Sequence, residues 1–503
     1  MILKFFPIFL LLTFFTSSAQ DKTYSEGIKG NNIIAQIDSI KISAQEFYFS
    51  YEYGPAFVKR DRDSKERYLD YMINEKLMAL DGYSRGIDTS KQTIDMLDEF
   101  KNDIASEELF KQDILSRIKI EESEIDSVIS KKNLVLEIKW LYAKDDEDVK
   151  SYLTQIKSGL TFDSLYSEQF KDSVYRDDRY MKIDRYLLER KNPMLAGVVD
   201  SLRVGEVSFP LHTDDGWYIV KLENVTQNLI TTESEYERMR QESVNSLKKE
   251  KMDKLSDQYV NEIMTEHNPI IKRDAFNFLR SYLGNVSLPH KKYTDWNLSE
   301  KLSTAIKNLN VSNENEYAQT TLVELKNGKF TINDFLTWFR NRSLYISLNE
   351  KDLKDFSISL ENLIWRMVRD RLLAQEAIEK GLANTESVMK QSRWWKDKIV
   401  SSIVRNEITN SVILDNKETK VNSNVDSSKE QTGINEEFNA KLLRKILALK
   451  KKYKVSINKD LLNEIHVSDE DNPGAVNFYF VKQGGLIPRT PYPTIDSDWI
   501  NWE

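Results

Sequence analysis

An internal repeat constrains the fold of this 503-residue chain more than any other feature. Residues 33–49, IIAQIDSIKISAQEFYF, follow the same pattern as residues 321–339, TLVELKNGKFTINDFLTWF. Each segment predicts a short strand of alternating apolar residues, a tight turn and the start of a helix. Ser43 and Thr331 stand just before these helices. Each is followed three residues later by an acidic side chain, which is the spacing of a helix capping box.

The repeat continues beyond these hairpins. Residues 69–88 and 363–383 both place apolar side chains at helical spacing, and both contain a glycine near their end. These glycines, Gly86 and Gly381, suit the left-handed residue that ends many helices. A duplicated chain with this period is expected to fold mainly into helices.

The two copies end alike and differ in the middle. A helical pattern at 233–266 and a shorter one at 435–453 are each followed by a brief extended stretch and a short helix. We expect each ending to belong to the copy that precedes it. The sequence predicts a first helical module at 33–133 and 226–285, an inserted domain at 134–225, a second helical module at 291–414 and 434–470, a polar flexible linker at 415–433 and a C-terminal arm at 471–503.

Residues 1–19 have the composition of a secretory signal peptide. Lys4 precedes an apolar run from Phe5 to Phe15, and small residues at 17–19 form a cleavage site. The run is shorter than the roughly 20 apolar residues that span a bilayer, and no comparable stretch follows it. The sequence therefore predicts export to a periplasmic space, as a soluble chain with no transmembrane segment after cleavage.

Composition argues against several classes of site. A net charge of −8 disfavours a broad nucleic-acid surface. The chain has no cysteine, so it has no thiolate nucleophile and no disulfide. Its 4 histidines are scattered without metal-ligand spacing. We predict no metal site and no cofactor.

The inserted segment predicts an α+β domain in which helices cover a small sheet. Its main strands are LEIKWLY and DGWYIVKL, and between them lie IKSGLTFDSLYSEQF and GEVSFP. These motifs resemble those of the parvulin-type (PpiC) peptidyl-prolyl isomerases. With the flanking helical modules and the signal peptide, they are similar to the SurA- and PrsA-like periplasmic chaperones. The fold class that follows is mainly α with an α+β insert: two related helical chaperone modules, the first interrupted by a parvulin-like domain.

The resemblance implies a histidine in the first strand of the insert and another in its last strand. In this sequence these positions fall on Lys139 and Tyr218, which are therefore the candidate catalytic residues. An ammonium and a phenol differ from imidazole in charge, reach and hydrogen-bonding pattern. The resemblance also implies a substrate-binding pocket, to which we assign Leu141, Phe162, Met194, Leu195 and Trp217.

Three hypotheses for the function follow from the resemblance. The first is an exported chaperone that binds unfolded or extended envelope-protein clients, such as outer-membrane proteins, with weak or absent prolyl isomerase activity. The candidate residues for its client groove are Trp338, Trp394 and Trp395, for which core packing is the alternative role. The second hypothesis is an active parvulin-type peptidyl-prolyl cis-trans isomerase. The third is a structural scaffold that contacts an envelope assembly or secretion machinery through the C-terminal arm, with Trp499 and Trp502 as contact residues.

Overall fold

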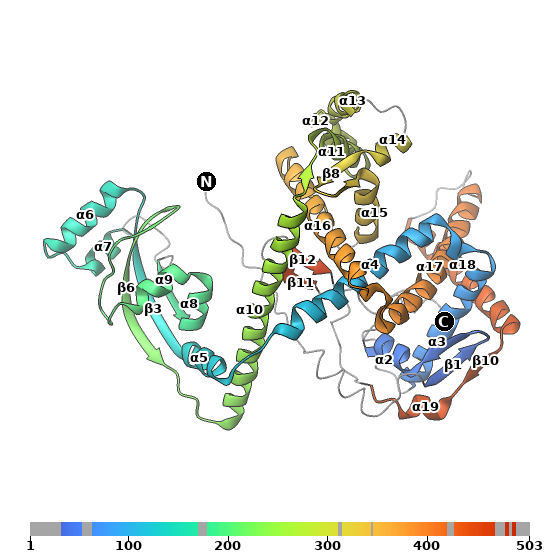
Figure 1. Cartoon of the computed structure of the whole chain (residues 1–503), viewed down its shortest axis with the longest axis horizontal. Helices are drawn as coiled ribbons and strands as arrows, with labels where there is room; N and C mark the ends of the chain where they lie inside the picture. Colours follow the sequence, from blue (N-terminus) through green and yellow to red (C-terminus); the bar gives the residue numbers. More distant parts are fainter. Residues whose placement is uncertain are drawn as a thin grey trace. The chain divides into compact units, whose positions relative to one another are not determined.

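The computed structural model describes residues 32–52, 63–169, 179–309, 314–343, 346–419, 427–467, 478–481 and 485–488. The predicted signal peptide lies outside these ranges. The chain divides into two compact units, one formed by Met1–Arg117 with Asp253–Glu503 and the other by Ile118–Met252. We call them the helical unit and the insert unit, and describe each by itself (Figure 1).

The helical unit contains the predicted repeat. The first copy consists of β1 (Ile33–Ile37), β2 (Ile40–Ser43), α2 (Ala44–Glu52) and α3 (Ser64–Ser84). The second consists of β8 (Thr321–Leu325), β9 (Gly328–Thr331), α15 (Ile332–Arg342) and α16 (Leu353–Glu379). Both hairpins are antiparallel, and the register shifts at the equivalent place in each, between Ile33 and Ala35 and between Thr321 and Val323. A shared irregularity of this kind supports a duplication.

Both predicted stop signals are confirmed, as is one of the two predicted capping boxes; at α2, Ser43 Oγ accepts from the Glu46 N–H, but the Glu46 carboxylate pairs with Lys76. Thr331 and Asp334 form a complete capping box at the start of α15. Gly86 and Gly381 adopt left-handed φ values of 72° and 77° after α3 and α16. Side chains rarely tolerate this conformation, so glycine suits both positions. A short 3-10 turn and a long helix follow each glycine, α4 (Lys91–Asp113) in the first copy and α17 (Glu386–Thr419) in the second.

The short strand that ends each copy in the sequence pairs with the hairpin of the other copy. We call these two strands the closing strands. Strand β10 (Val455–Ile457), from late in the chain, pairs with β1, whereas β7 (Ile270–Ile271) pairs with β8. Helix α17 likewise packs on α3, and α4 packs on α16. This grouping differs from the expected modules, in which 226–285 belonged to the first copy and 434–470 to the second. Either closing strand suits either hairpin, because β1 and β8 carry the same alternation of buried side chains.

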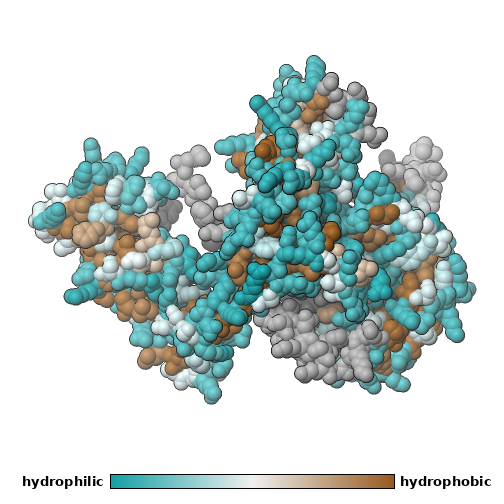
Figure 2. Space-filling model, viewed as in Figure 1, coloured by the Kyte–Doolittle hydropathy of each residue, from teal (hydrophilic) through white to brown (hydrophobic). Residues whose placement is uncertain are grey.

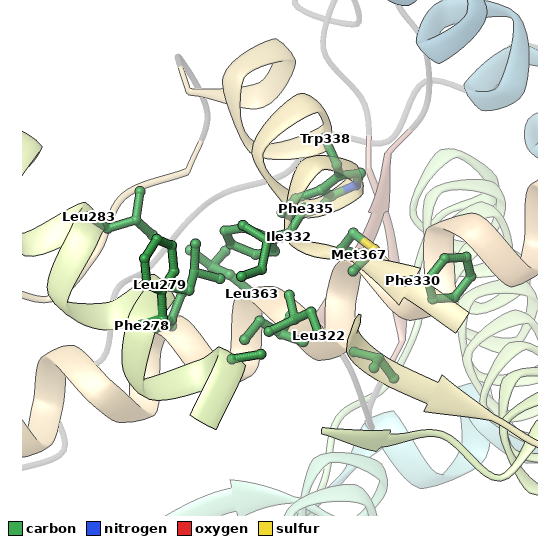
Figure 3. Packing of buried hydrophobic residues seen from close by; sticks show 14 of the residues in the cluster. Phe278, Leu279, Leu283, Leu322, Phe330, Ile332, Phe335, Trp338, Leu363 and Met367 are labelled. Atoms are coloured by element: carbon green, nitrogen blue, oxygen red, sulfur yellow. The ribbon is translucent and has the colours of Figure 1, made fainter. Parts of the chain in front are cut away.

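Two hydrophobic cores result from this exchange. One joins β1, β2, α2 and α3 to Val404 of α17 and to Leu442 and Ile446 of α18 (Ser427–Lys452). The other joins α11 (Arg273–Ser287), α13 (Leu298–Leu309) and β8 to α15 and α16. Phe335 and Trp338 of α15 are fully buried in this second core, where Figure 3 shows them among side chains from α11, β8 and α16.

The two copies meet where α4 crosses α17. Phe100 and Trp395 stack there with ring centroids 4.0 Å apart and planes 15° from parallel. Phe100 follows Ser90, before α4, by as many positions as Trp395 follows Thr385, before α17. Equivalent positions of the repeat thus contact each other, as they do across the axis of a symmetric dimer.

Buried ion pairs also join the copies. Arg342 Nη1 of α15 lies 2.9 Å from Glu99 Oε2 of α4, and the same guanidinium pairs with Asp103. Within the second copy, the indole N–H of Trp338 donates to Asp370 Oδ2 at 2.9 Å. Such pairs fix the register of packed helices, since removing one partner leaves a buried charge uncompensated.

The other described elements of the helical unit are α12 (His290–Asp295), α14 (Glu314–Gln319), α19 (Lys459–Glu464), β11 (Phe478–Val481) and β12 (Gly485–Pro488). The segment predicted as a flexible linker, 415–433, is helical in part: α17 reaches Thr419 and α18 begins at Ser427. A run of polar residues without regularly spaced apolar ones occurs at solvated helix ends as well as in linkers. Composition alone therefore predicted a linker that is too long. Trp499 and Trp502 of the C-terminal arm lie outside the described residues.

The insert unit holds a four-stranded antiparallel sheet in the order β4-β3-β6-β5. Its elements are α5 (Glu122–Asn133), β3 (Leu134–Ala143), α6 (Asp146–Lys157), α7 (Phe162–Glu168), β4 (Tyr180–Asp184), α8 (Arg185–Lys191), α9 (Pro193–Asp200), β5 (Leu211–Thr213), β6 (Gly216–Gln227) and the first part of α10 (Glu233–His267). Helices α6 and α7 pack on one face of the sheet, and α8 and α9 on the other. The unit is wider than the expected 134–225, because Ile125 and Ile129 of α5 form a core with Tyr186 and with Leu247 of α10.

The predicted fold class, mainly α with an α+β insert, is confirmed. Within the described ranges, none of the helices combines the length and the apolar composition that crossing a membrane requires.

Candidate functional site

The sheet of the insert unit places the two candidate catalytic residues on opposite faces. Tyr142 of β3 lies directly opposite Tyr218 of β6. Side chains alternate between faces along a strand, so Lys139 shares a face with Leu141, while Tyr218 shares the other face with Trp140. Lys139 and Tyr218 therefore do not border one pocket. The residues of β3 on the same face as Tyr218 include Trp140 and Tyr142.

Lys139 takes part in an ionic cluster on its face. Its Nζ lies 3.3 Å from Glu223 Oε2 and 3.9 Å from Asp163 Oδ1. Lys221, the cross-strand neighbour of Lys139, donates to Asp163 Oδ2 at 2.7 Å. The ammonium of Lys139 also lies 5.4 Å from the ring centroid of Tyr166. These contacts account for Lys139 as an ion-pair partner of the Asp163 and Glu223 carboxylates.

Tyr218 belongs to a hydrogen-bonded cluster at the β5–β6 turn. Its hydroxyl donates to Asp215 Oδ2 at 2.8 Å, and Thr213 Oγ1 donates to Asp215 Oδ1 at 2.5 Å. Partial burial and the Asp215 carboxylate raise the pKa of Tyr218 to about 12. The hydrogen bonds from Thr213 and Tyr218 hold the pKa of Asp215 below its usual range. Tyr218 is therefore a neutral phenol whose proton is directed to a carboxylate.

An aromatic surface surrounds Tyr218. The rings of Tyr142 and Tyr218 meet edge to face, with centroids 5.4 Å apart. Trp140, Leu195 and Tyr218 all pack, half-buried, on the core beneath this face of the sheet. We call Trp140, Tyr142, Leu195 and Tyr218 the aromatic face. The signal for Trp140 and Tyr142 was present in the sequence, since residues two apart in a strand share a face.

The other predicted substrate-binding residues divide between the two sides of the sheet. Leu141 and Phe162 are buried in the core against α6 and α7, where Trp217 packs at the edge. Met194 is 56% exposed at the start of α9, directly before Leu195. Of the five residues assigned to the pocket, Leu195 alone belongs to the aromatic face, with Met194 adjacent in sequence. Phe209, which sequence reasoning missed, is 93% exposed.

The three tryptophans predicted for a client groove do not line an open surface. Trp338 and Trp394 are buried. Trp395 stacks on Phe100 where α4 crosses α17. Their alternative role in core packing accounts for all three. Among the described residues, no group of three or more His, Cys, Asp or Glu side chains is placed to hold a metal ion.

Comparison with known proteins adds to this geometry. A parvulin-like PPIase of Rickettsia typhi is 24% identical over 234 residues, which is 44% of this chain and 80% of the relative. The chain resembles the parvulin-like PPIases. A second such protein, from Rickettsia felis, is 25% identical over 165 residues, covering 31% of this chain and 58% of the relative. No family model matches the chain.

Solved structures were also compared. PrsA, a peptidylprolyl isomerase of Bacillus cereus, has 17% identity and a TM-score of 0.22, over 56% of this chain and 99% of its own. A structure from a study of PEB4 and Cj1289, two SurA-like chaperones of Campylobacter jejuni, has 18% identity and a TM-score of 0.22, over 46% of this chain and 97% of its own. TM-scores of this size do not correspond to a common overall superposition.

Proposed function

We propose that this protein is an exported chaperone of the SurA/parvulin type that holds unfolded or extended envelope-protein clients and has weak or absent prolyl isomerase activity. One observation supports the proposed weak or absent isomerase activity. The two positions assigned to the family's histidines point to opposite faces of the sheet, and the hydroxyl of Tyr218 already donates to Asp215.

Prolyl isomerisation has a barrier of about 18–20 kcal/mol, set by rotation about the amide bond. An enzyme lowers this barrier by making hydrogen bonds that fit the twisted amide better than the planar one. Tyr218 has a single proton, and that proton is bonded to a carboxylate at 2.8 Å. The aromatic face therefore offers apolar contact to a proline ring while its central hydroxyl is not available as a donor.

Exposed apolar pairs on the helical unit support the holding function. Tyr282 and Val286 of α11 are 40% and 68% exposed, and Leu443 and Leu447 of α18 are 40% and 50% exposed. Residues four apart share one side of a helix, so each pair forms a short apolar ridge. Figure 2 shows hydrophobic residues scattered between hydrophilic ones on the face that it presents. Several small apolar sites of this kind suit weak, multiple contacts with an extended chain.

The test is aggregation suppression of an unfolded outer-membrane protein, run beside a proline-peptide isomerisation assay on the same preparation. We expect holding at stoichiometric concentration and an isomerisation rate close to the uncatalysed one. A rate enhancement that Tyr218→Ala abolishes would instead favour an active isomerase, the alternative that the parvulin-like relatives support. Release of the processed chain into the periplasm of the producing cell would test the proposed localisation.

A further inference from the structure

We infer that Asp215 is the positioning residue of the aromatic face, holding the rings of Tyr142 and Tyr218 as a rigid wall for the proline side chain of an extended peptide. The inference rests on the proposed peptide-holding function of the insert unit and names the residue that prepares this site.

Asp215 contacts both tyrosines through different atoms. Its carboxylate accepts from the Tyr218 hydroxyl at 2.8 Å, and its backbone carbonyl accepts from the Tyr142 hydroxyl at 2.6 Å. Thr213 Oγ1 donates its single proton to the other carboxylate oxygen at 2.5 Å and also lies 2.9 Å from the carbonyl oxygen of Gly216. One residue of the turn therefore fixes both phenols.

The turn itself is tightly held against β3. Thr213 and Gly216 are paired across β5 and β6, which leaves a two-residue connection at Asp214 and Asp215. Gly216 has a φ of 147°, and a Cβ on it would lie 2.7 Å from the carbonyl oxygen of Ala143 and 2.7 Å from the Tyr142 ring. A glycine is needed for this close approach. The backbone at Asp215 is thus in place before any peptide binds.

Fixing the rings matters because binding otherwise has to order them. Immobilising a flexible side chain on association costs about 0.5–1.5 kcal/mol, so rings held in advance favour affinity. The edge-to-face pair at 5.4 Å and the half-buried Trp140 present flat apolar surfaces beside Leu195. A proline ring is rigid and apolar, and its nitrogen carries no hydrogen to leave unpaired. This surface therefore suits a prolyl side chain in an extended peptide.

The first measurement is the titration of Tyr218 in the full chain, followed by NMR of tyrosine labelled at the Cζ carbon. Tyr218→Phe identifies the resonance. In the unaltered protein we expect this group to titrate near pH 12, and in Asp215→Ala at a lower pH, because the carboxylate no longer raises the pKa of Tyr218 while partial burial still does. The neighbouring exposed carboxylate provides the matched control, Asp214→Ala, which should leave the resonance unchanged. A Tyr218 resonance that titrates identically in Asp215→Ala overturns the inference.

The second measurement is the affinity of the full chain for a fluorescent eight-residue peptide with a central Ala-Pro bond. We expect Asp215→Ala to raise Kd about 3- to 10-fold, the range that the ordering cost corresponds to. Asp214→Ala should leave Kd unchanged, and Asp215→Asn, which keeps an acceptor oxygen, should restore it to within about 2-fold. If the unaltered protein fails to bind this peptide, the peptide-holding function of the insert unit is wrong. If it binds and Asp215→Ala binds equally well, that function stands and the positioning role of Asp215 is wrong.

Discussion

At the scale of single residues, the least usual feature of the helical unit is a buried ammonium between two carboxylates. Lys76 of α3 lies 2.5 Å from Glu46 of α2 and 2.7 Å from Asp397 of α17, and its side chain is 3% exposed. Burial raises the pKa of Glu46 to about 7. This ionic cluster ties together helices of both copies of the repeat, since α17 follows the second copy.

The raised pKa predicts a pH dependence of stability. A carboxyl whose folded pKa exceeds its unfolded value of 4.5 binds its proton more tightly in the folded state. Its contribution is present below pH 4.5 and is lost as pH rises through about 7, an effect on the order of 3 kcal/mol. We expect Glu46→Gln to flatten this part of the curve of unfolding free energy against pH. Urea unfolding between pH 4 and 8 measures it, with the exposed Glu66→Gln as control; equal slopes in both variants would contradict the prediction.

At the scale of helices and strands, the exchange of closing strands has a direct test. Proline at Ser456 would remove a backbone donor from β10 opposite Gln36 of β1, and proline at Ile270 would do the same in β7 opposite Glu324 of β8. We expect Ser456→Pro to lower protection of residues 33–52 and 64–84 in amide hydrogen exchange, and Ile270→Pro to lower protection of residues 321–342 and 353–372. Each substitution removes one ladder hydrogen bond and should cost about 1–3 kcal/mol.

The outcome separates the observed pairing from the one expected from chain order. If Ser456→Pro instead exposed 321–339 and left 33–49 protected, β10 would belong to the second copy. The two variants serve as controls for each other, because they alter equivalent strands of the repeat. Mass spectrometry of proteolytic fragments resolves the two regions.

What the sequence predicted at this scale depended on local chemistry. The hairpins, the capping box at Thr331 and the glycines at 86 and 381 are set by neighbouring residues, and all are confirmed. Which hairpin a closing strand joins is a long-range choice, and the alternating apolar patterns of β1 and β8 do not distinguish the partners. At the site, the family resemblance named Lys139 and Tyr218 together, whereas the two-residue period of paired strands sends their side chains to opposite faces.

At the scale of the whole molecule, the helical unit offers its own candidate contacts for a client, in addition to the aromatic face of the insert unit. Its candidate contacts are the exposed apolar ridges of Tyr282 with Val286 and of Leu443 with Leu447. Single exposed apolar residues are common on protein surfaces. A pair on one side of a helix is a larger target, and the two ridges lie on helices that pack in different cores.

Client contact at these ridges predicts that substitutions there reduce client holding without unfolding the protein. Val286→Asp and Leu447→Asp each add a charge to one ridge, where an apolar client segment would have to desolvate it. Because both side chains are exposed, each change should alter the free energy of unfolding by no more than about 0.5 kcal/mol. We expect each variant to suppress aggregation of an unfolded outer-membrane protein less well, and the double variant to suppress it less well than either single variant.

Ile94→Asp is the matched control, since Ile94 is 44% exposed on α4 and belongs to neither ridge. It adds the same charge to the helical unit and should leave aggregation suppression unchanged. If the two ridge variants and their double variant gave the same curve of light scattering against chaperone concentration as the unaltered protein, client contact would lie away from the ridges. Because the aromatic face belongs to the insert unit, its Tyr218→Ala variant would then decide whether that unit holds the client: lost suppression would assign it there, and unaltered suppression would leave neither surface as the contact.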